Sequence, residues 1–182
     1  MRMIVEKLHE VEKAIEESRQ KRTRADRNEP VQLVAVTKNH DVAAMREAID
    51  AGVTVIGENR IQEARQKHAT LEREVSWHLI GHLQTNKAKQ AVEIFDLIHS
   101  VDSIHLARAL DQAAEKHGKV QDILVQVNLA REESKSGVYE EALPMLLAAV
   151  DELTHLRLCG LMCIAPNYDN VEQCRPLFRR MY

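Results

Sequence analysis

Short apolar, β-branched segments alternate with helical segments along this chain, and this alternation is the strongest constraint on its fold. Six of these segments have the near-continuous hydrophobicity of parallel strands that are covered on both faces. They are residues 31–37, 53–59, 75–81, 95–101, 122–130 and 156–166. Because helical patterns fill the gaps between them, the sequence predicts βαβ units and an α/β fold with a parallel sheet.

Two parallel architectures fit this pattern, an open doubly wound sheet and a (β/α)₈ barrel. A doubly wound sheet usually has a glycine-rich turn after its first strand, whereas residues 38–41 contain no glycine. That favours the barrel, although a closed barrel needs further strands beyond these six. The last strand is followed by the start of another helix at residues 170–182, and residues 2–22 form an extra amphipathic helix before the first strand. The pattern therefore indicates an incomplete barrel.

The composition is that of an ordinary soluble globular protein. The chain has 182 residues, 45% of them hydrophobic and 29% charged, which suits a single domain spanning residues 1–182. The net charge of −3, spread over mixed acidic and basic residues, gives no sign of nucleic-acid binding. No segment is apolar enough to span a membrane. Three cysteines, an odd number, suggest reduced thiols and a cytoplasmic location.

Functional residues of parallel α/β folds lie at the carboxyl ends of the strands. Lys38 directly follows the first apolar segment. It is either a surface lysine that ends the strand or an amine placed to form a Schiff base, which partial burial would favour. Asn59 follows the second segment and either caps the next helix or lines a ligand site.

Two histidines and a serine occupy other strand ends. His78 and His82 fall in a strand and its loop rather than on one helix face, so a metal site is disfavoured and a hydrogen bond to a ligand is favoured. Ser136 lies in a small polar loop that either supplies donors to an anion or enters a helix. Cys159 and Cys163 are expected to be buried free thiols rather than a redox pair.

Five sequence blocks at the strand ends occur together in one known family. They are AVTKNHD (35–41), GENRIQEA (57–64), WHLIGHLQTNK (77–87), NLAREESKSG (128–137) and LRLCGLMCIAP (156–166). In this combination and order the chain resembles the pyridoxal phosphate homeostasis proteins, also called the YggS or PROSC family. Members are similar to the N-terminal barrel of alanine racemase, and the resemblance covers residues 2–182.

The resemblance implies a fold, a cofactor and a set of site residues. The fold is a TIM-type (β/α)₈ barrel with an extra N-terminal helix, and the cofactor is pyridoxal 5′-phosphate (PLP), bound at the carboxyl end of the barrel. The family's Schiff-base lysine falls on Lys38. Asn59, His78, Ser136 and Met162 fall on family positions that line the pocket, and no metal is expected.

The resemblance also bears on function. The family has a seventh and an eighth strand, so the chain is expected to be a barrel truncated at its C-terminus and to favour self-association through its open edge. The implied function is non-catalytic PLP binding for vitamin B6 homeostasis, with PLP passed to PLP-dependent apo-enzymes. The alternative is a racemase- or lyase-like enzyme that acts on amino acids. No catalytic residue is assigned, because no second domain supplies the second acid/base group of a racemase.

Overall fold

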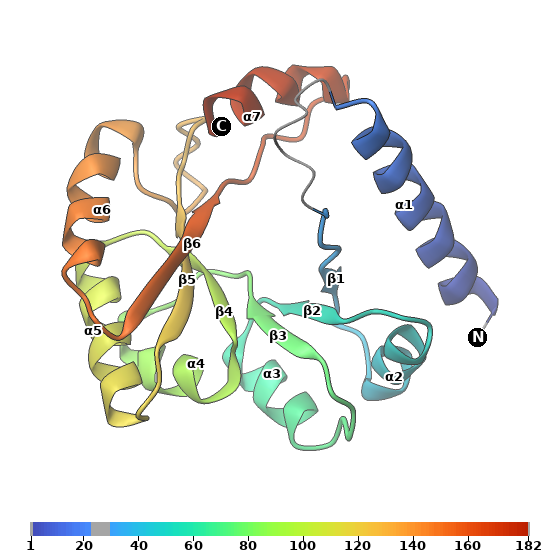
Figure 1. Ribbon diagram of the computed structural model, residues 1–182, viewed down its shortest axis with the longest axis horizontal. Helices are drawn as coiled ribbons and strands as arrows, with labels where there is room; N and C mark the ends of the chain where they lie inside the picture. The colour runs from blue at the N-terminus through green and yellow to red at the C-terminus, as the bar shows by residue number, and fades with distance from the viewer. Residues whose placement is uncertain (1, 23–29, 182) are drawn as a thin grey trace.

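The computed structural model describes residues 2–22 and 30–181, and Figure 1 shows an arc of strands with helices along its outer side. The described residues form a six-stranded parallel sheet in the order β1-β2-β3-β4-β5-β6. The strands are β1 (Ala35–Val36), β2 (Val55–Glu58), β3 (Ser76–Leu79), β4 (Leu97–Val101), β5 (Gln121–Gln126) and β6 (Leu156–Met162).

The strand order distinguishes between the two predicted architectures. A doubly wound sheet reverses its strand order at a switch point, whereas a barrel adds each strand beside the preceding one. The observed order is sequential throughout, so the prediction of a barrel-type α/β fold is confirmed. β1 and β6 each pair with one neighbour and not with each other, and the barrel is therefore incomplete.

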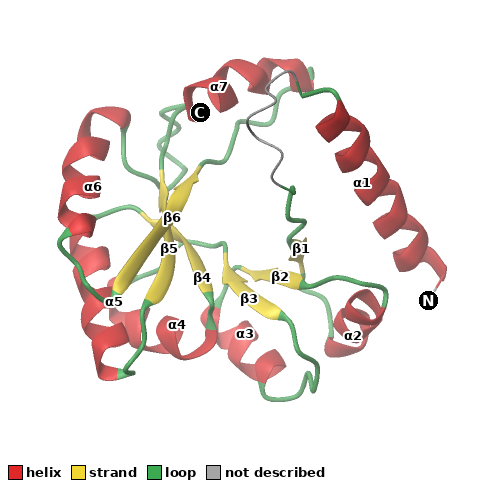
Figure 2. Cartoon of the chain, viewed as in Figure 1, coloured by secondary structure: helices red, strands yellow, loops and turns green. Residues whose placement is uncertain are grey.

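Helices follow the strands and cover the convex side of the arc (Figure 2). The α-helices are α1 (Arg2–Gln20), α2 (Val42–Asp50), α3 (Ile61–His68), α4 (Ala88–Ile94), α5 (Ile104–Lys116), α6 (Leu143–Asp151) and α7 (Arg175–Met181). Three short 3-10 turns precede α4, α6 and α7, namely η1 (Thr85–Lys87), η2 (Glu140–Ala142) and η3 (Val171–Cys174). No described helix is both long and apolar enough to cross a lipid bilayer.

The hydrophobic core lies between the sheet and these helices. Ile56 of β2, Ile98 of β4 and Ile123 of β5 are fully buried, and they belong to one cluster with Phe95 and Leu110. Burying each such side chain contributes about 2 kcal/mol through the removal of apolar surface from water. The core thus fixes the sheet and leaves its carboxyl rim free to carry polar side chains.

The structure corrects the predicted extent of the first strand and the predicted burial of Cys159. The first strand was expected over residues 31–37, but only Ala35 and Val36 form it. The reason is that β1 is an edge strand, which has a hydrogen-bonding neighbour on one side only. The expectation of buried cysteines is wrong for Cys159, which is exposed because β6 is the other edge strand.

Candidate functional site

The carboxyl ends of the strands form one rim of the arc, and the predicted site residues lie along it. Lys38 follows β1, Asn59 follows β2, and His78 lies near the end of β3. Ser136 lies in the loop after β5, and Met162 is the last residue of β6. The fold therefore places five residues from distant parts of the sequence at the same rim, as the barrel pattern predicted.

Lys38 lies in a turn directly after β1, with Asn39 in the left-handed conformation at φ 63°. Asparagine is one of the few residues that adopts this conformation readily. Within residues 2–22 and 30–181, no hydrogen bond or ion pair involves the Lys38 ammonium group. Lys38 is exposed, so the partial burial that would favour a Schiff-base amine is not observed. Among the described residues β1 pairs only with β2, and Val36, two residues before Lys38, is also 46% exposed.

A buried ion-pair network lies beside this turn. Lys67 of α3 donates hydrogen bonds of 2.7 Å to the backbone carbonyl of Thr37, to Glu58 Oε1 and to Glu63 Oε1. The Thr37 hydroxyl donates to the same Glu58 oxygen at 2.6 Å. Glu58, Thr37 and Lys67 are 0%, 6% and 7% exposed, so these three residues are shielded from solvent, whereas the Glu63 side chain is partly exposed. It connects the end of β1 to β2 and α3.

The network keeps Lys67 charged despite its burial. Desolvation by itself lowers the pKa of Lys67, but the hydrogen bonds to Glu58 and Glu63 outweigh it and the pKa is raised. The Lys67 ammonium and the backbone N–H of Asn39 together lower the pKa of Glu63. The Lys67 ammonium and the Glu63 carboxylate therefore stabilise each other in their charged forms, and the buried ammonium is paired, as a buried charge must be.

Asn59 has an unsatisfied acceptor at the rim. Its Oδ1 is buried and has no hydrogen-bond partner among the described residues. The alternative that Asn59 caps the next helix is wrong, because the N-cap of α3 is Arg60 and makes no side-chain hydrogen bond. Buried polar atoms are rarely left unpaired, so the side chain is available to a ligand donor.

His78 pairs with a histidine that sequence reasoning did not select. His99 Nε2 and His78 Nδ1 are 3.0 Å apart, and the ring centroids lie 5.0 Å apart. Burial lowers the pKa of His78, and burial followed by the nearby His78 lowers the pKa of His99 to about 4. Both rings are therefore neutral at neutral pH, and one donates to the other.

Ser136 lies close to His82 and Asp102 at the next part of the rim. Ser136 Oγ is 3.1 Å from His82 Nδ1, and Asp102 Oδ2 is 3.8 Å from the same nitrogen. A nucleophilic triad needs the serine and the carboxylate on opposite ring nitrogens, so this arrangement cannot activate Ser136. Burial raises the pKa of Asp102. The cluster can offer hydrogen bonds to a ligand without supplying a nucleophile.

The five predicted residues do not form one contact network. Met162 is half-buried and pairs in register with Gln126 of β5. In the described part of the chain, no hydrogen bond joins Lys38 to Asn59, His78 or Ser136. Sequence reasoning also missed Glu63 and Lys67, although their four-residue spacing in a predicted helix is a visible signal for an ion pair.

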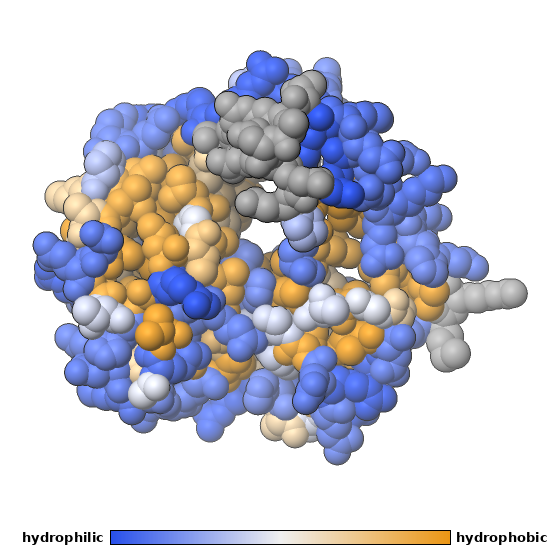
Figure 3. Space-filling view, viewed as in Figure 1, coloured by the Kyte–Doolittle hydropathy of each residue, from blue (hydrophilic) through white to orange (hydrophobic). Residues whose placement is uncertain are grey.

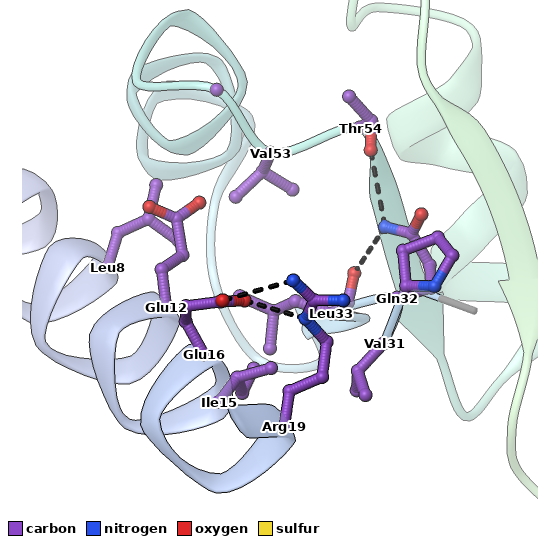
Figure 4. Close-up of a pocket in the computed structure, with 12 residues that line it drawn as sticks. Leu8, Glu12, Ile15, Glu16, Arg19, Val31, Gln32, Leu33, Val53 and Thr54 are labelled. Atoms are coloured by element: carbon purple, nitrogen blue, oxygen red, sulfur yellow. Dashed lines mark hydrogen bonds and ion pairs between the residues drawn. The ribbon is translucent and has the colours of Figure 1, made fainter. Parts of the chain in front are cut away.

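A cavity of about 390 Å³ lies away from this rim. Figure 4 shows it between α1 and the segments that lead into β1 and β2, at the amino ends of these strands. Its lining includes apolar Leu8 and Val53, together with a Glu16–Arg19 ion pair on α1. The described residues also contain no group of three potential metal ligands. The candidate site is therefore the rim, where the unpartnered amine and the orphan acceptor lie.

Comparison with known proteins assigns this chain to a family. Residues 13–181 match the alanine racemase N-terminal domain model. The pyridoxal phosphate homeostasis protein of Aquifex aeolicus is 40% identical over 160 residues, and that of Synechocystis is 44% identical over 138 residues. The chain belongs to the pyridoxal phosphate homeostasis protein family. These matches cover 87% and 75% of this chain but 70% and 63% of the two relatives.

Solved structures agree with this family assignment. The structure of PipY from Synechococcus elongatus with PLP bound is 39% identical, with a TM-score of 0.82 over 98% of this chain and 78% of that chain. An alanine racemase from Clostridium difficile is 13% identical, with a TM-score of 0.69 over 85% of this chain and 42% of that chain. At that identity the racemase supports the shared barrel fold and nothing more.

Proposed function

We propose that this protein binds PLP without catalysing a reaction on it and serves PLP homeostasis in the cytoplasm. Lys38 holds PLP as a Schiff base, and Asn59, His78, Ser136 and Met162 line the site. The observation that carries the proposal is the Lys38 amine, which has no partner among the described residues and stands at the carboxyl rim of a barrel of this family.

The residues at the rim fit the chemistry of PLP. When bound, PLP supplies an aldehyde that a lysine amine can hold reversibly. Lys38 forms the carbon–nitrogen bond in its neutral form, and one water is released. The orphan Oδ1 of Asn59 and the neutral ring of His78 offer hydrogen-bonding groups beside it. The chain's own residues thus provide both a covalent anchor and polar contacts.

A non-catalytic role is supported by the names of the relatives. The relatives are named as homeostasis proteins rather than enzymes. We further propose that the protein releases PLP to PLP-dependent apo-enzymes, for which reversible attachment to an exposed lysine is suitable.

The test of PLP attachment uses Lys38→Ala. We expect the parent protein to develop the absorption band of a Schiff base with PLP and Lys38→Ala to lose it. The other amine beside this turn, that of Lys67, is buried and bonded to Glu58 and Glu63. Borohydride reduction followed by peptide mass analysis should locate the adduct on Lys38. Lys135→Ala, which changes another exposed lysine in the Ser136 loop, should retain the band. An unchanged band in Lys38→Ala would show that the assignment is wrong.

The enzyme alternative has a separate test. PLP-loaded protein is incubated in deuterated water with a panel of amino acids, and deuterium at the α-carbon is measured. We expect no incorporation above a PLP-only control. Incorporation that depends on Lys38 would support a racemase- or lyase-like activity instead.

A further inference from the structure

We propose that the cluster of Lys67, Glu58 and Glu63, in which Lys67 and Glu58 are buried, is a positioning device for Lys38. Lys67 and Glu63 do not touch PLP in this proposal; they fix the turn that carries the reactive amine. The functional consequence rests on the proposed function, whereas the anchoring of the turn is independent of PLP.

Hydrogen bonds hold the chain on both sides of Lys38. On the amino side, the Thr37 carbonyl accepts from Lys67 Nζ at 2.7 Å and from the backbone N–H of His40 at 3.0 Å. On the carboxyl side, the backbone N–H of Asn39 donates to Glu63 Oε1 at 2.7 Å. Since Lys67 and Glu63 also bond to each other at 2.7 Å, one ion pair on α3 fixes both flanks.

The turn needs this support because the sheet supplies little. β1 consists of Ala35 and Val36 and pairs only with β2. Lys38, Asn39 and His40 are all exposed, so packing does not restrain them. Without the side-chain bonds, Lys38 would follow a short edge strand with few restraints. A reactive group that is held in the wrong place reacts much more slowly.

The chemistry of the cluster argues against a role in stability alone. Buried ion pairs are weak contributors to stability, because desolvation of the charges offsets their attraction. Glu58 is fully buried, yet its Oε2 has no hydrogen-bond partner among the described residues. Apolar side chains could fill the same space, but they could not bond to the backbone groups that flank Lys38. The hydrogen bonds to the backbone on both sides of Lys38 therefore explain why the side chains of this cluster are polar.

The experiment compares Lys67→Met and Glu63→Ala with a matched control. Lys119→Met makes the same change at a lysine that bonds to the carbonyls of Val92 and Phe95, away from the rim. Amide hydrogen exchange of residues 38–40 is measured without PLP, and the rate of Schiff-base formation is measured with PLP. Each variant is studied at a fixed interval below its own melting temperature.

We expect exchange at residues 38–40 to accelerate by about tenfold or more in both cluster variants. Schiff-base formation should slow by about tenfold or more in the same variants, and Lys119→Met should match the parent in both readouts. If Lys67→Met does not fold, Glu63→Ala alone tests the proposal. This variant is expected to fold, because the Glu63 side chain is already 23% exposed.

Two outcomes would overturn the proposal. An amide exchange rate at residues 38–40 of Glu63→Ala that equals the rate in the parent protein would show that the cluster does not hold the turn. Faster exchange with a parental rate of Schiff-base formation would show that the held conformation does not matter to the amine. A parent protein that forms no adduct on Lys38 would instead refute the proposed function, and the exchange rates would still decide whether the cluster anchors the turn.

Discussion

At the scale of single residues, the His78–His99 pair makes the rim sensitive to acid. The pKa of His99 is lowered to about 4, chiefly by burial, and burial lowers the pKa of His78 as well. An unfolded histidine titrates near pH 6.5. Between these two pH values the unfolded chain binds more protons than the folded one, so the free energy of unfolding decreases as the pH falls.

We therefore expect His99→Gln to weaken this pH dependence. The parent should lose about 2 kcal/mol more stability than the variant between about pH 7 and about pH 4.5, because Gln cannot take up the proton. Urea unfolding at the two pH values measures the difference. His105→Gln, at an exposed histidine of α5, should retain the parental pH dependence. An equal loss in the parent and in His99→Gln would contradict the assignment.

At the scale of elements, the loop after β3 packs directly on the end of β2. A Cβ atom at Gly81 would lie 2.3 Å from the carbonyl oxygen of Asn59 and 2.7 Å from its Cα. Both are backbone atoms that cannot move as a flexible side chain can. Only glycine therefore fits at position 81, and its backbone lies directly against that of Asn59.

Gly81→Ala should lower the free energy of unfolding by about 2–3 kcal/mol, since the methyl group forces the two segments apart. It should also weaken PLP binding, because Asn59 is displaced. Denaturant unfolding and PLP titration measure the two effects. Gly118→Ala is the control, since nothing lies within 4 Å there and only its φ of +63° is strained. It should cost about 1 kcal/mol and leave PLP binding unchanged.

At the scale of the whole molecule, the open sheet exposes apolar side chains at its β6 edge. Leu158 is 41% exposed in this strand, and Ile164 beyond its end is 48% exposed. Figure 3 shows apolar surface gathered over this side of the arc. Unpaired strand edges with apolar side chains favour pairing with another chain, so we expect self-association through the β6 edge.

Leu158→Lys should weaken this association by about tenfold, because a charged side chain disfavours pairing at an edge strand. The monomer's free energy of unfolding should change by less than about 0.5 kcal/mol, as is usual at an exposed position. Sedimentation velocity over a range of concentrations measures the association. Met145→Lys replaces a side chain that is 64% exposed on α6 rather than in an edge strand, so it should not alter association. Equal effects of the two variants would show that the edge is not the interface.

The sequence by itself determined the fold class, the six strand positions and the residues at the strand ends. These properties are local, because apolar runs and helical periodicity depend on neighbours along the chain. The five sequence blocks also identified the family, which the comparisons confirmed. Boundaries were less accurate, and β1 shows why: its length depends on which strand lies beside it.

Only the tertiary structure decided how the site residues are partnered. Lys67 bonds to Thr37 across 30 residues, and His99 meets His78 across 21 residues. Such contacts depend on strand register and on how α3 lies against the sheet, which no local pattern encodes. The exposure of Lys38 was also decided at this level, because it follows from the open side of β1. The sequence thus located Lys38, the lysine that we propose as the PLP anchor, and the three-dimensional packing determined which side chains contact its turn.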